Sequence, residues 1–328
     1  MTSLQTYEIK SKLADFTGIL MNVEETTPKF GGDWTKRKLE VLEKYLNAYT
    51  QALKKQPFQL IYIDAFAGVG SIDLAHNETQ QSHGLLFSYI TSSKENDELR
   101  NLIDGSAKMA LKIKRPFDLY YFIEIDKERC KSLDILKEEF PSLSDRIYIE
   151  CGDANNKVIS LCESIDWTKN RAVLFLDPLG MQVEWSTIQK IAGTKAIDLW
   201  WLFPLSAVNR MLPKDIDKVI PAWKDRLTKV FGTDTWLKAF YEKSKAIQPT
   251  LWENLPGQTT VKTGGMDCII QYTLTRLKEV FPGVLETPPI LYNSKGSPLY
   301  LFCFAVSNPS PKAQEVALKI ASDIKKGF

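Results

Sequence analysis

The sequence predicts an α/β protein with a doubly wound, mostly parallel sheet, a helical insertion and a C-terminal antiparallel hairpin. Short apolar runs alternate with helical patterns between residues 35 and 204, as a parallel sheet with helices on both faces requires. Successive runs end in an acid, and the first leads into a glycine-rich turn. Because ligands bind beyond the carboxyl ends of such strands, we expect these acids to meet at one edge of the sheet.

The composition is that of an ordinary globular protein. Of the 328 residues, 44% are hydrophobic and 25% are charged, so the chain can bury a sizeable core. The net charge of +2 neither favours nor excludes a nucleic-acid partner. No apolar stretch is long enough to span a membrane or to form the core of a signal peptide. We therefore expect a cytoplasmic protein with no membrane contact.

The cysteines and histidines do not form a recognisable ligand pattern. The five cysteines are odd in number, widely spaced and without a C-x-x-C pair, which argues against a disulfide framework and against a zinc cluster. The two histidines, His76 and His83, form no H-E-x-x-H motif. We expect reduced cysteines and no metal.

The N-terminal part of the chain divides into an arm and a helix. Residues 1–34 show no sustained period and predict a loosely structured arm. An apolar stripe at steps of three and four follows from Leu39 to Leu53. This spacing predicts a helix of about 20 residues that begins near Asp33 or Thr35.

Strands and helices then alternate as far as Pro204. Strands are predicted at 60–63, 119–123, 147–149, 172–176 and 197–203. Helices are predicted at 85–104, from Gly105 onward, at 127–140 and at 185–191. The strand runs lack a clean apolar–polar alternation, as expected for strands covered on both faces.

The segment 205–285 has a mostly helical pattern and predicts an insertion or cap. Nine basic residues and five acids lie between Arg210 and Lys245, together with Trp223 and Trp236. An amphipathic cap with a solvated face accounts for this pattern. A lid that grips a phosphate backbone and stacks bases on tryptophan accounts for it too.

The last part of the chain, 286–328, completes the core formed by 35–204. Segments 288–292 and 299–306 flank a Ser-Lys-Gly-Ser turn and predict an antiparallel hairpin, and a closing helix follows.

The glycine-rich turn after the first strand is a candidate cofactor loop. Gly68 and Gly70 allow a ligand to lie directly against the main chain. Asp73 stands where the nicotinamide fingerprint needs its third glycine, and the Lys of a P-loop is missing. Asp64, at the end of the strand, suits a ligand with an ammonium group better than a pyrophosphate. The alternative is a tight strand-to-helix turn that binds no cofactor.

This order of acids and glycines resembles that of class I S-adenosyl-L-methionine-dependent methyltransferases, which have a Rossmann-like fold. The motif D-A-F-A-G-V-G is similar to their first motif. The resemblance implies that Asp64 lies near the cofactor's ammonium group, and that Phe66, Gly68 and Gly70 lie against the cofactor. It also assigns Glu124 to the ribose hydroxyls and Asp153 to the adenine amine. Plain helix caps or salt bridges are the alternative roles for Asp64 and Glu124.

A second motif, Asp177-Pro178-Leu179-Gly180, follows the fourth strand. It resembles the Asp-Pro-Pro-Tyr or Asp-Pro-Phe-Gly motifs of enzymes that methylate exocyclic amines of bases. Such an amine is a poor nucleophile, so an acceptor side chain and a carbonyl must hold its two N–H groups. The resemblance assigns these roles to Asp177 and Pro178.

We also expect Leu179, Gly180, Pro204 and Lys38 to lie on the substrate side. For Lys38 the alternative is a solvated lysine on the first helix. The motif lacks the aromatic ring that stacks a flipped base, a role for which Trp185, Trp200 and Trp201 are the candidates. Asp-Pro is also a common strand-ending turn with a helix cap.

Over nearly its whole length the chain resembles the bacterial three-Cys-motif partner proteins. The resemblance rests on Trp34–Tyr45 with Lys38, Y-I-D-A-F-A-G-V-G, Gly105-Ser106, F-L-D-P-L-G-M and P-L-Y-L-F-C-F-A. It implies a methyltransferase-like fold and a partner with three clustered cysteines.

Three functional hypotheses follow. The first is methylation of an exocyclic amine of an RNA or DNA base, in concert with the cysteine-motif protein. The second is a non-catalytic, methyltransferase-like partner subunit in a mobile-element or defence system. The third is a different chemistry on bound S-adenosyl-L-methionine.

Overall fold

The computed structural model describes residues 33–68, 105–243 and 260–326. All of them belong to one compact unit, Gly31–Phe328. The N-terminal arm, apart from its last two residues, lies outside the described residues. So do Gly70, both histidines and the helix expected at 85–104.

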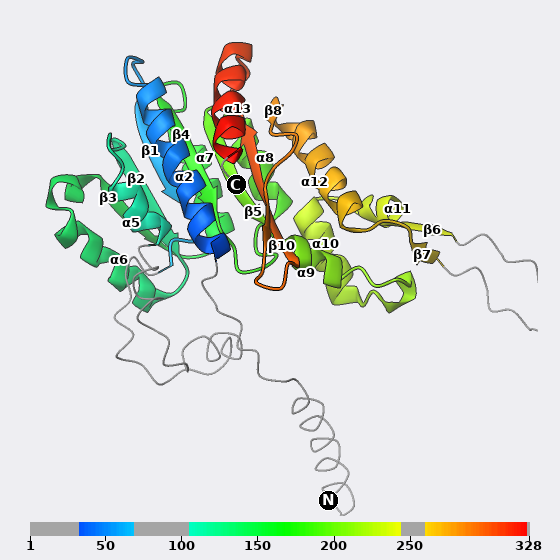
Figure 1. The fold of residues 1–328 in the computed structure, drawn as a ribbon. Coiled ribbons are helices and arrows are strands. Elements are labelled where there is room, and N and C mark those ends of the chain that lie inside the picture. Colours follow the sequence, from blue (N-terminus) through cyan, green and yellow to red (C-terminus); the bar gives the residue numbers. More distant parts are fainter. Residues whose placement is uncertain (1–32, 69–104, 244–259, 327–328) are drawn as a thin grey trace, which may run out of the picture. The chain divides into compact units, whose positions relative to one another are not determined.

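An eight-stranded sheet organises the unit, with strand order β3-β2-β1-β4-β5-β10-β8 and β9 paired to β10 (Figure 1). The first five strands are parallel: β1 Gln59–Asp64, β2 Leu119–Glu124, β3 Ile147–Cys151, β4 Asn170–Leu176 and β5 Ile197–Phe203. Three antiparallel strands follow: β8 Gly283–Val284, β9 Ile290–Tyr292 and β10 Pro298–Val306. A mixed α/β fold with a mostly parallel sheet is therefore confirmed.

The central strands are covered on both faces, which explains their uninterrupted apolar runs. All seven residues of β5 are buried, and the last five of β1 are buried too. Successive side chains of a strand point to opposite faces. Alternate residues of each run therefore enter two different apolar clusters.

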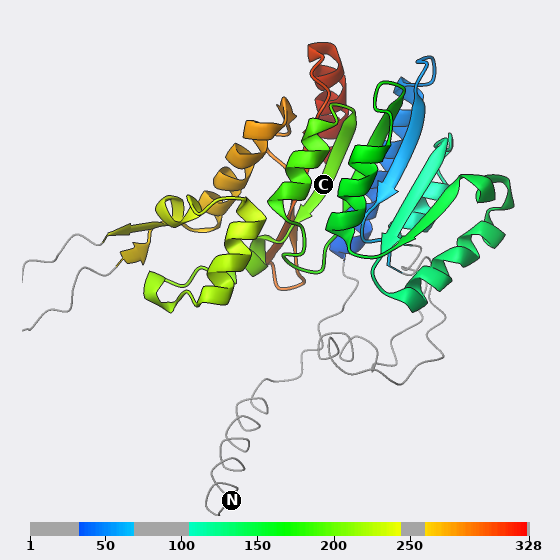
Figure 2. The same cartoon turned by 180° about the vertical axis from the view of Figure 1, so that it is seen from behind.

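Helices form a layer on each face of the sheet (Figures 1 and 2). One cluster includes buried residues of α2 Asp33–Ala52, α5 Ser106–Leu111, α6 Lys127–Glu139 and α13 Pro311–Lys325. The opposite cluster includes residues of α7 Ala154–Ser164 and α8 Trp185–Gly193. Helix α7, which begins after the N-cap Asp153, was not expected from the sequence.

Segment 205–285 packs on the α7–α8 side and is only partly helical. Its elements are α9 Leu205–Arg210, η2 Ile216–Lys218, α10 Pro221–Phe231, α11 Trp236–Phe240, β6 Tyr241–Lys243, β7 Thr260–Lys262, α12 Met266–Val280 and β8. The small antiparallel sheet β6–β7 and the strand β8 were not expected. Trp236 is fully buried and donates from Nε1 to Thr228 Oγ1 at 3.1 Å, so it is not free to stack a base.

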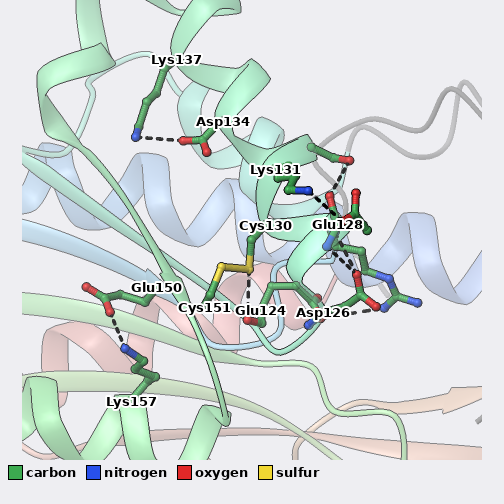
Figure 3. The surroundings of a disulfide bond; sticks show 12 residues. Glu124, Asp126, Glu128, Cys130, Lys131, Asp134, Lys137, Glu150, Cys151 and Lys157 are labelled. Carbon is green, nitrogen blue, oxygen red and sulfur yellow. Dashed lines mark hydrogen bonds and ion pairs between the residues drawn. A yellow bond between two sulfur atoms is a disulfide. The ribbon is translucent and has the colours of Figure 1, made fainter.

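A disulfide joins Cys130 of α6 to Cys151 of β3 (Figure 3). The expectation of reduced cysteines is wrong for this pair. The two residues are 21 positions apart, and only the pairing of β2 with β3 brings them together. Cys151 is the register partner of Glu124, and the Sγ of Cys130 lies 3.3 Å from the Glu124 carbonyl oxygen. The disulfide therefore ties α6 to β3 directly behind Glu124.

The described residues contain neither a helix that could cross a membrane nor a group of side chains that could hold a metal ion. None of the helices described is long and apolar enough to cross a membrane. Within residues 33–68, 105–243 and 260–326, no group of three or more His, Cys, Asp or Glu side chains is arranged to hold a metal ion.

Candidate functional site

The strand order brings the predicted acids to one edge of the sheet. Asp64 and Glu124 are the last residues of β1 and β2, and Asp153 and Asp177 follow β3 and β4. These strands are parallel neighbours in the order β3-β2-β1-β4. Their carboxyl ends therefore share one rim of the sheet.

A cavity of about 190 Å³ opens at the ends of β1, β2 and β3. Phe66, Glu124 and Asp153 line it, so three of the residues assigned to the cofactor meet there. Asp64 and Gly68 are not among its lining residues. The other lining residues are Ala65, Ile125, Gly152, Ala154, Asn155, Gln182, Glu184 and Arg226.

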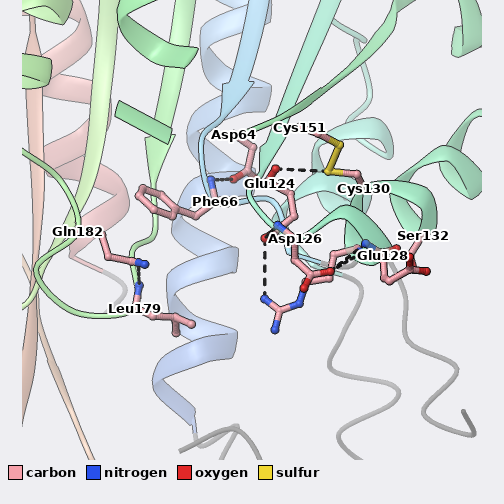
Figure 4. Close-up of polar contacts among 11 residues, drawn as sticks. Asp64, Phe66, Glu124, Asp126, Glu128, Cys130, Ser132, Cys151, Leu179 and Gln182 are labelled. Carbon is pink, nitrogen blue, oxygen red and sulfur yellow. Dashed lines mark hydrogen bonds and ion pairs between the residues drawn. A yellow bond between two sulfur atoms is a disulfide. The ribbon is translucent and has the colours of Figure 1, made fainter. Parts of the chain in front are cut away.

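Asp64 is fully buried and organises the turn beneath the rim (Figure 4). Its Oδ1 accepts from the Phe66 N–H, and its Oδ2 accepts from the Tyr62 hydroxyl, both at 3.3 Å. Burial raises the pKa of Asp64 to about 7, and the charge of Asp177 also raises it. Hydrogen bonds from Ser106 and Phe66 and the charge of Lys38 act in the opposite direction. Asp64 therefore fixes the loop that carries Phe66 and does not face the cavity.

Glu124 has its carboxylate held at the cavity wall. Its Oε1 accepts from the Asp126 N–H at 3.0 Å, and the Nη1 of Arg129 lies 4.0 Å from the same oxygen. Ile125, the next residue, is 67% exposed. An acid followed by an exposed apolar side chain can accept hydrogen bonds from a ligand's hydroxyl groups while an aliphatic surface contacts its ring.

Asp153 caps helix α7, accepting from the Asn156 N–H at 2.9 Å. Asp153 therefore both caps a helix and lines the cavity. Gly152, before it, has φ of 152°, a conformation that favours glycine.

Asp177 forms an ion pair with Lys38 of α2. The Lys38 side chain is only 7% exposed, whereas that of Asp177 is 24% exposed. The Nζ of Lys38 also lies 5.4 Å from the centroid of the Trp34 ring and 5.9 Å from that of Phe175. Lys38 therefore belongs to the surroundings of Asp177.

The residues after Asp177 form a tight turn. The Gly180 N–H donates to the Pro178 carbonyl oxygen at 3.0 Å, and Gly180 has φ of 89°. This leaves the Pro178 oxygen one further lone pair. The Leu179 N–H donates to Gln182 Oε1 at 2.8 Å, and the Leu179 side chain is 73% exposed. Pro204 is buried at the end of β5, where its carbonyl accepts from the Val208 N–H at 3.0 Å.

The tryptophans expected to stack a base are unsuited to that role. Trp185, Trp200 and Trp201 are buried, each 2% exposed or less. Trp34 and Tyr300 lie near the Lys38–Asp177 pair. Neither was among the candidates for stacking a base. Their ring centroids are 5.3 Å apart. Trp34 and Lys38 are one helical turn apart, which places them on the same face of α2.

Asn155, Gln182 and Arg226 are further site residues that sequence reasoning missed. Asn155 donates to the Gln182 carbonyl at 2.9 Å and accepts from the Glu184 N–H at 3.0 Å. Arg226 of α10 donates to the Met181 carbonyl at 3.3 Å. Together they hold the loop after β4 against the cavity, and no motif marks them.

Comparison with known proteins does not identify a family. No protein-family model and no curated protein matches the chain. One similar solved structure is a DUF519-family protein from Legionella pneumophila str. Philadelphia 1, with 18% identity and a TM-score of 0.37; it covers 62% of this chain and 75% of that chain. Another is a conserved hypothetical protein from Streptococcus pyogenes, with 12% identity and a TM-score of 0.28; it covers 65% of this chain and 91% of that chain. Neither likeness assigns a function to this chain.

Proposed function

We propose that this protein is an S-adenosyl-L-methionine-dependent methyltransferase that acts on an exocyclic amine of a nucleic-acid base. The cavity at the ends of β1–β3 carries the proposal. It gathers Phe66, Glu124 and Asp153, three of the six residues that the methyltransferase resemblance assigns to the cofactor.

The donor set of the cavity fits the nucleoside part of that cofactor. Glu124 and Asp153 offer carboxylate acceptors for hydroxyl and amine hydrogens, and Ile125 and Phe66 offer apolar surface for a ring. The volume of about 190 Å³ is below the roughly 300–1,000 Å³ of whole small-molecule pockets. It therefore suits a nucleoside rather than the complete ligand. When bound, S-adenosyl-L-methionine supplies an electrophilic methyl group.

The sheet supports the same proposal. The resemblance to class I methyltransferases implies a Rossmann-like sheet with a late antiparallel hairpin. In this chain β9 and β10 pair antiparallel, and β10 also runs antiparallel beside β5.

Asp177 and Pro178 would handle the acceptor. The carboxylate of Asp177 accepts one amine N–H, and the free lone pair of the Pro178 oxygen accepts the other. Lys38 forms an ion pair with Asp177 and so helps to orient its carboxylate at this rim.

Calorimetric titration with S-adenosylhomocysteine tests the cofactor site. We expect micromolar binding to the wild-type protein and binding about 10- to 100-fold weaker to Glu124→Gln, since a hydrogen bond to a charged group contributes about 1.5–3 kcal/mol. Glu150→Gln is the matched control, because Glu150 lies in β3, pairs with Lys157 and is not a cavity residue. No binding to the wild type, or equal losses in both variants, would refute the assignment.

A non-catalytic, methyltransferase-like subunit is the second candidate, and the Lys38–Asp177 ion pair favours it. An ammonium group already occupies the carboxylate that the acceptor amine would need. The family resemblance adds a three-Cys-motif protein as the partner under either function. Stable co-purification with that protein, with no methyl transfer to RNA or DNA by the complex although S-adenosylhomocysteine binds, would select this candidate over catalysis.

A further inference from the structure

The aromatic pair Trp34–Tyr300 lies beside the Lys38–Asp177 ion pair. Trp34 is in the first turn of α2, and Tyr300 is near the start of β10. The Trp34 ring is 5.3 Å from the Tyr300 ring and 5.4 Å from the Nζ of Lys38. Two aromatic rings and the ion pair thus form one cluster.

The antiparallel direction of β10 brings Tyr300 to this rim. Leu301 is the register partner of Phe203, the last residue of β5. Tyr300 therefore lies beside Pro204, at the carboxyl end of β5. Burial raises the pKa of the Tyr300 hydroxyl, the charge of Asp177 raises it further, and the charge of Arg210 lowers it. Tyr300 thus lies within electrostatic reach of Asp177.

Both rings are only partly buried, unlike the three tryptophans of the sheet and α8. Two exposed basic residues lie near the rings. Arg37 is three residues after Trp34 and so on a neighbouring position of the surface of α2. Arg210, at the end of α9, is exposed as well. Partly exposed rings with cations around them are typical of sites that stack bases and hold phosphates.

We propose that Trp34 and Tyr300 form the stacking platform for an unpaired base of a single-stranded nucleic acid and present its exocyclic amine to Asp177. This inference rests on the proposed function for the role of Asp177. It supplies the aromatic surface that the Asp-Pro-Leu-Gly motif lacks. Arg37 and Arg210 contact the flanking phosphates.

Fluorescence anisotropy with a short, mixed-sequence, single-stranded RNA and its DNA counterpart tests the platform. We expect Trp34→Ala and Tyr300→Ala each to weaken binding about 5- to 150-fold, since stacking on an aromatic ring contributes about 1–3 kcal/mol per base. Trp34→Phe and Tyr300→Phe keep a ring and should retain most of the affinity. Trp167→Ala is the matched control, because Trp167 precedes β4 at the opposite edge of the sheet.

An abasic oligonucleotide of the same length separates stacking from phosphate contacts. It should bind the wild type and the alanine variants equally weakly. Unchanged affinity in the alanine variants, equal binding of abasic and base-containing strands, or no binding of either strand to the wild type would overturn the platform. Thermal unfolding of each variant identifies any loss that comes from misfolding, and the phenylalanine variants then decide the test.

S-adenosylhomocysteine titration of the same proteins keeps the two proposals apart. Cofactor binding without base-dependent oligonucleotide binding overturns the platform alone. Base-dependent oligonucleotide binding without cofactor binding overturns the methyltransferase and leaves the platform.

Discussion

The substitution Asp198→Asn should make the protein's stability less sensitive to pH. Asp198 is a buried residue of β5 whose Oδ2 accepts from the Tyr45 hydroxyl at 2.7 Å. Burial raises the pKa of Asp198 from 3.8 to about 7, against the opposing effects of Tyr45 and Arg171. The folded protein therefore holds this proton more tightly than the unfolded chain. The stability that Asp198 contributes is fully present below about pH 4 and is lost as the pH rises to about 7.

The magnitude follows from the two pKa values. The difference between about 7 and 3.8 corresponds to about 4 kcal/mol, at about 1.4 kcal/mol per pKa unit. Asparagine does not titrate, so the stability of Asp198→Asn relative to wild type should grow by up to about 4 kcal/mol between pH 4 and pH 8. Any fixed cost of burying the asparagine amide cancels in this comparison.

Urea unfolding followed by circular dichroism at pH 4, 6 and 8 measures the difference. Asp166→Asn is the control, since hydrogen bonds from Thr168 lower the pKa of this exposed acid and its effect should have the opposite sign. A stability difference between Asp198→Asn and wild type that does not change with pH would refute the reasoning.

Two further substitutions test the packing around the site. Lys38→Met leaves the Asp177 carboxylate without its ammonium partner and should lower the free energy of unfolding in urea at pH 7 by about 2 kcal/mol. This is less than for a fully buried pair, because Asp177 is partly exposed. The double variant with Asp177→Asn should recover most of this loss, and no recovery would contradict the ion-pair account. Gly232→Ala should destabilise by about 2–5 kcal/mol, because Gly232 has φ of 70° and a Cβ there would lie 2.1 Å from Trp185 Cδ1. Gly193→Ala, where a Cβ meets no atom within 4 Å, should not destabilise, and equal unfolding midpoints for the two variants would count against the clash.

The sequence was sufficient for the parallel strands because their signals are local. Each is an apolar run ended by an acid, a glycine or a proline, and β5 was predicted with the bounds that the structure has. The strands β6 and β7 have three residues each and pair with one another. A run of three residues is too short to show a period, so only tertiary contacts reveal them.

The site was harder to predict than the fold, because its parts come from distant segments. The acids could be placed at one rim because each follows a strand of a sheet that was expected to be parallel. The burial of Asp64, the pairing of Cys130 with Cys151 and the meeting of Trp34 with Tyr300 depend on how separate elements pack. No local pattern encodes such contacts.

The position of β10 has a consequence for the order in which the rim is completed during synthesis. Strands β1 to β3 are complete at Cys151, and the last residue that lines the cavity, Arg226, follows in α10. Tyr300 is made much later, and it reaches the neighbourhood of Asp177 only when β10 pairs with β5. A nascent chain that lacks β10 would have the cavity walls but not the aromatic wall beside Asp177. The two halves of the rim therefore mature at different times, and the second waits for the closing strand of the sheet.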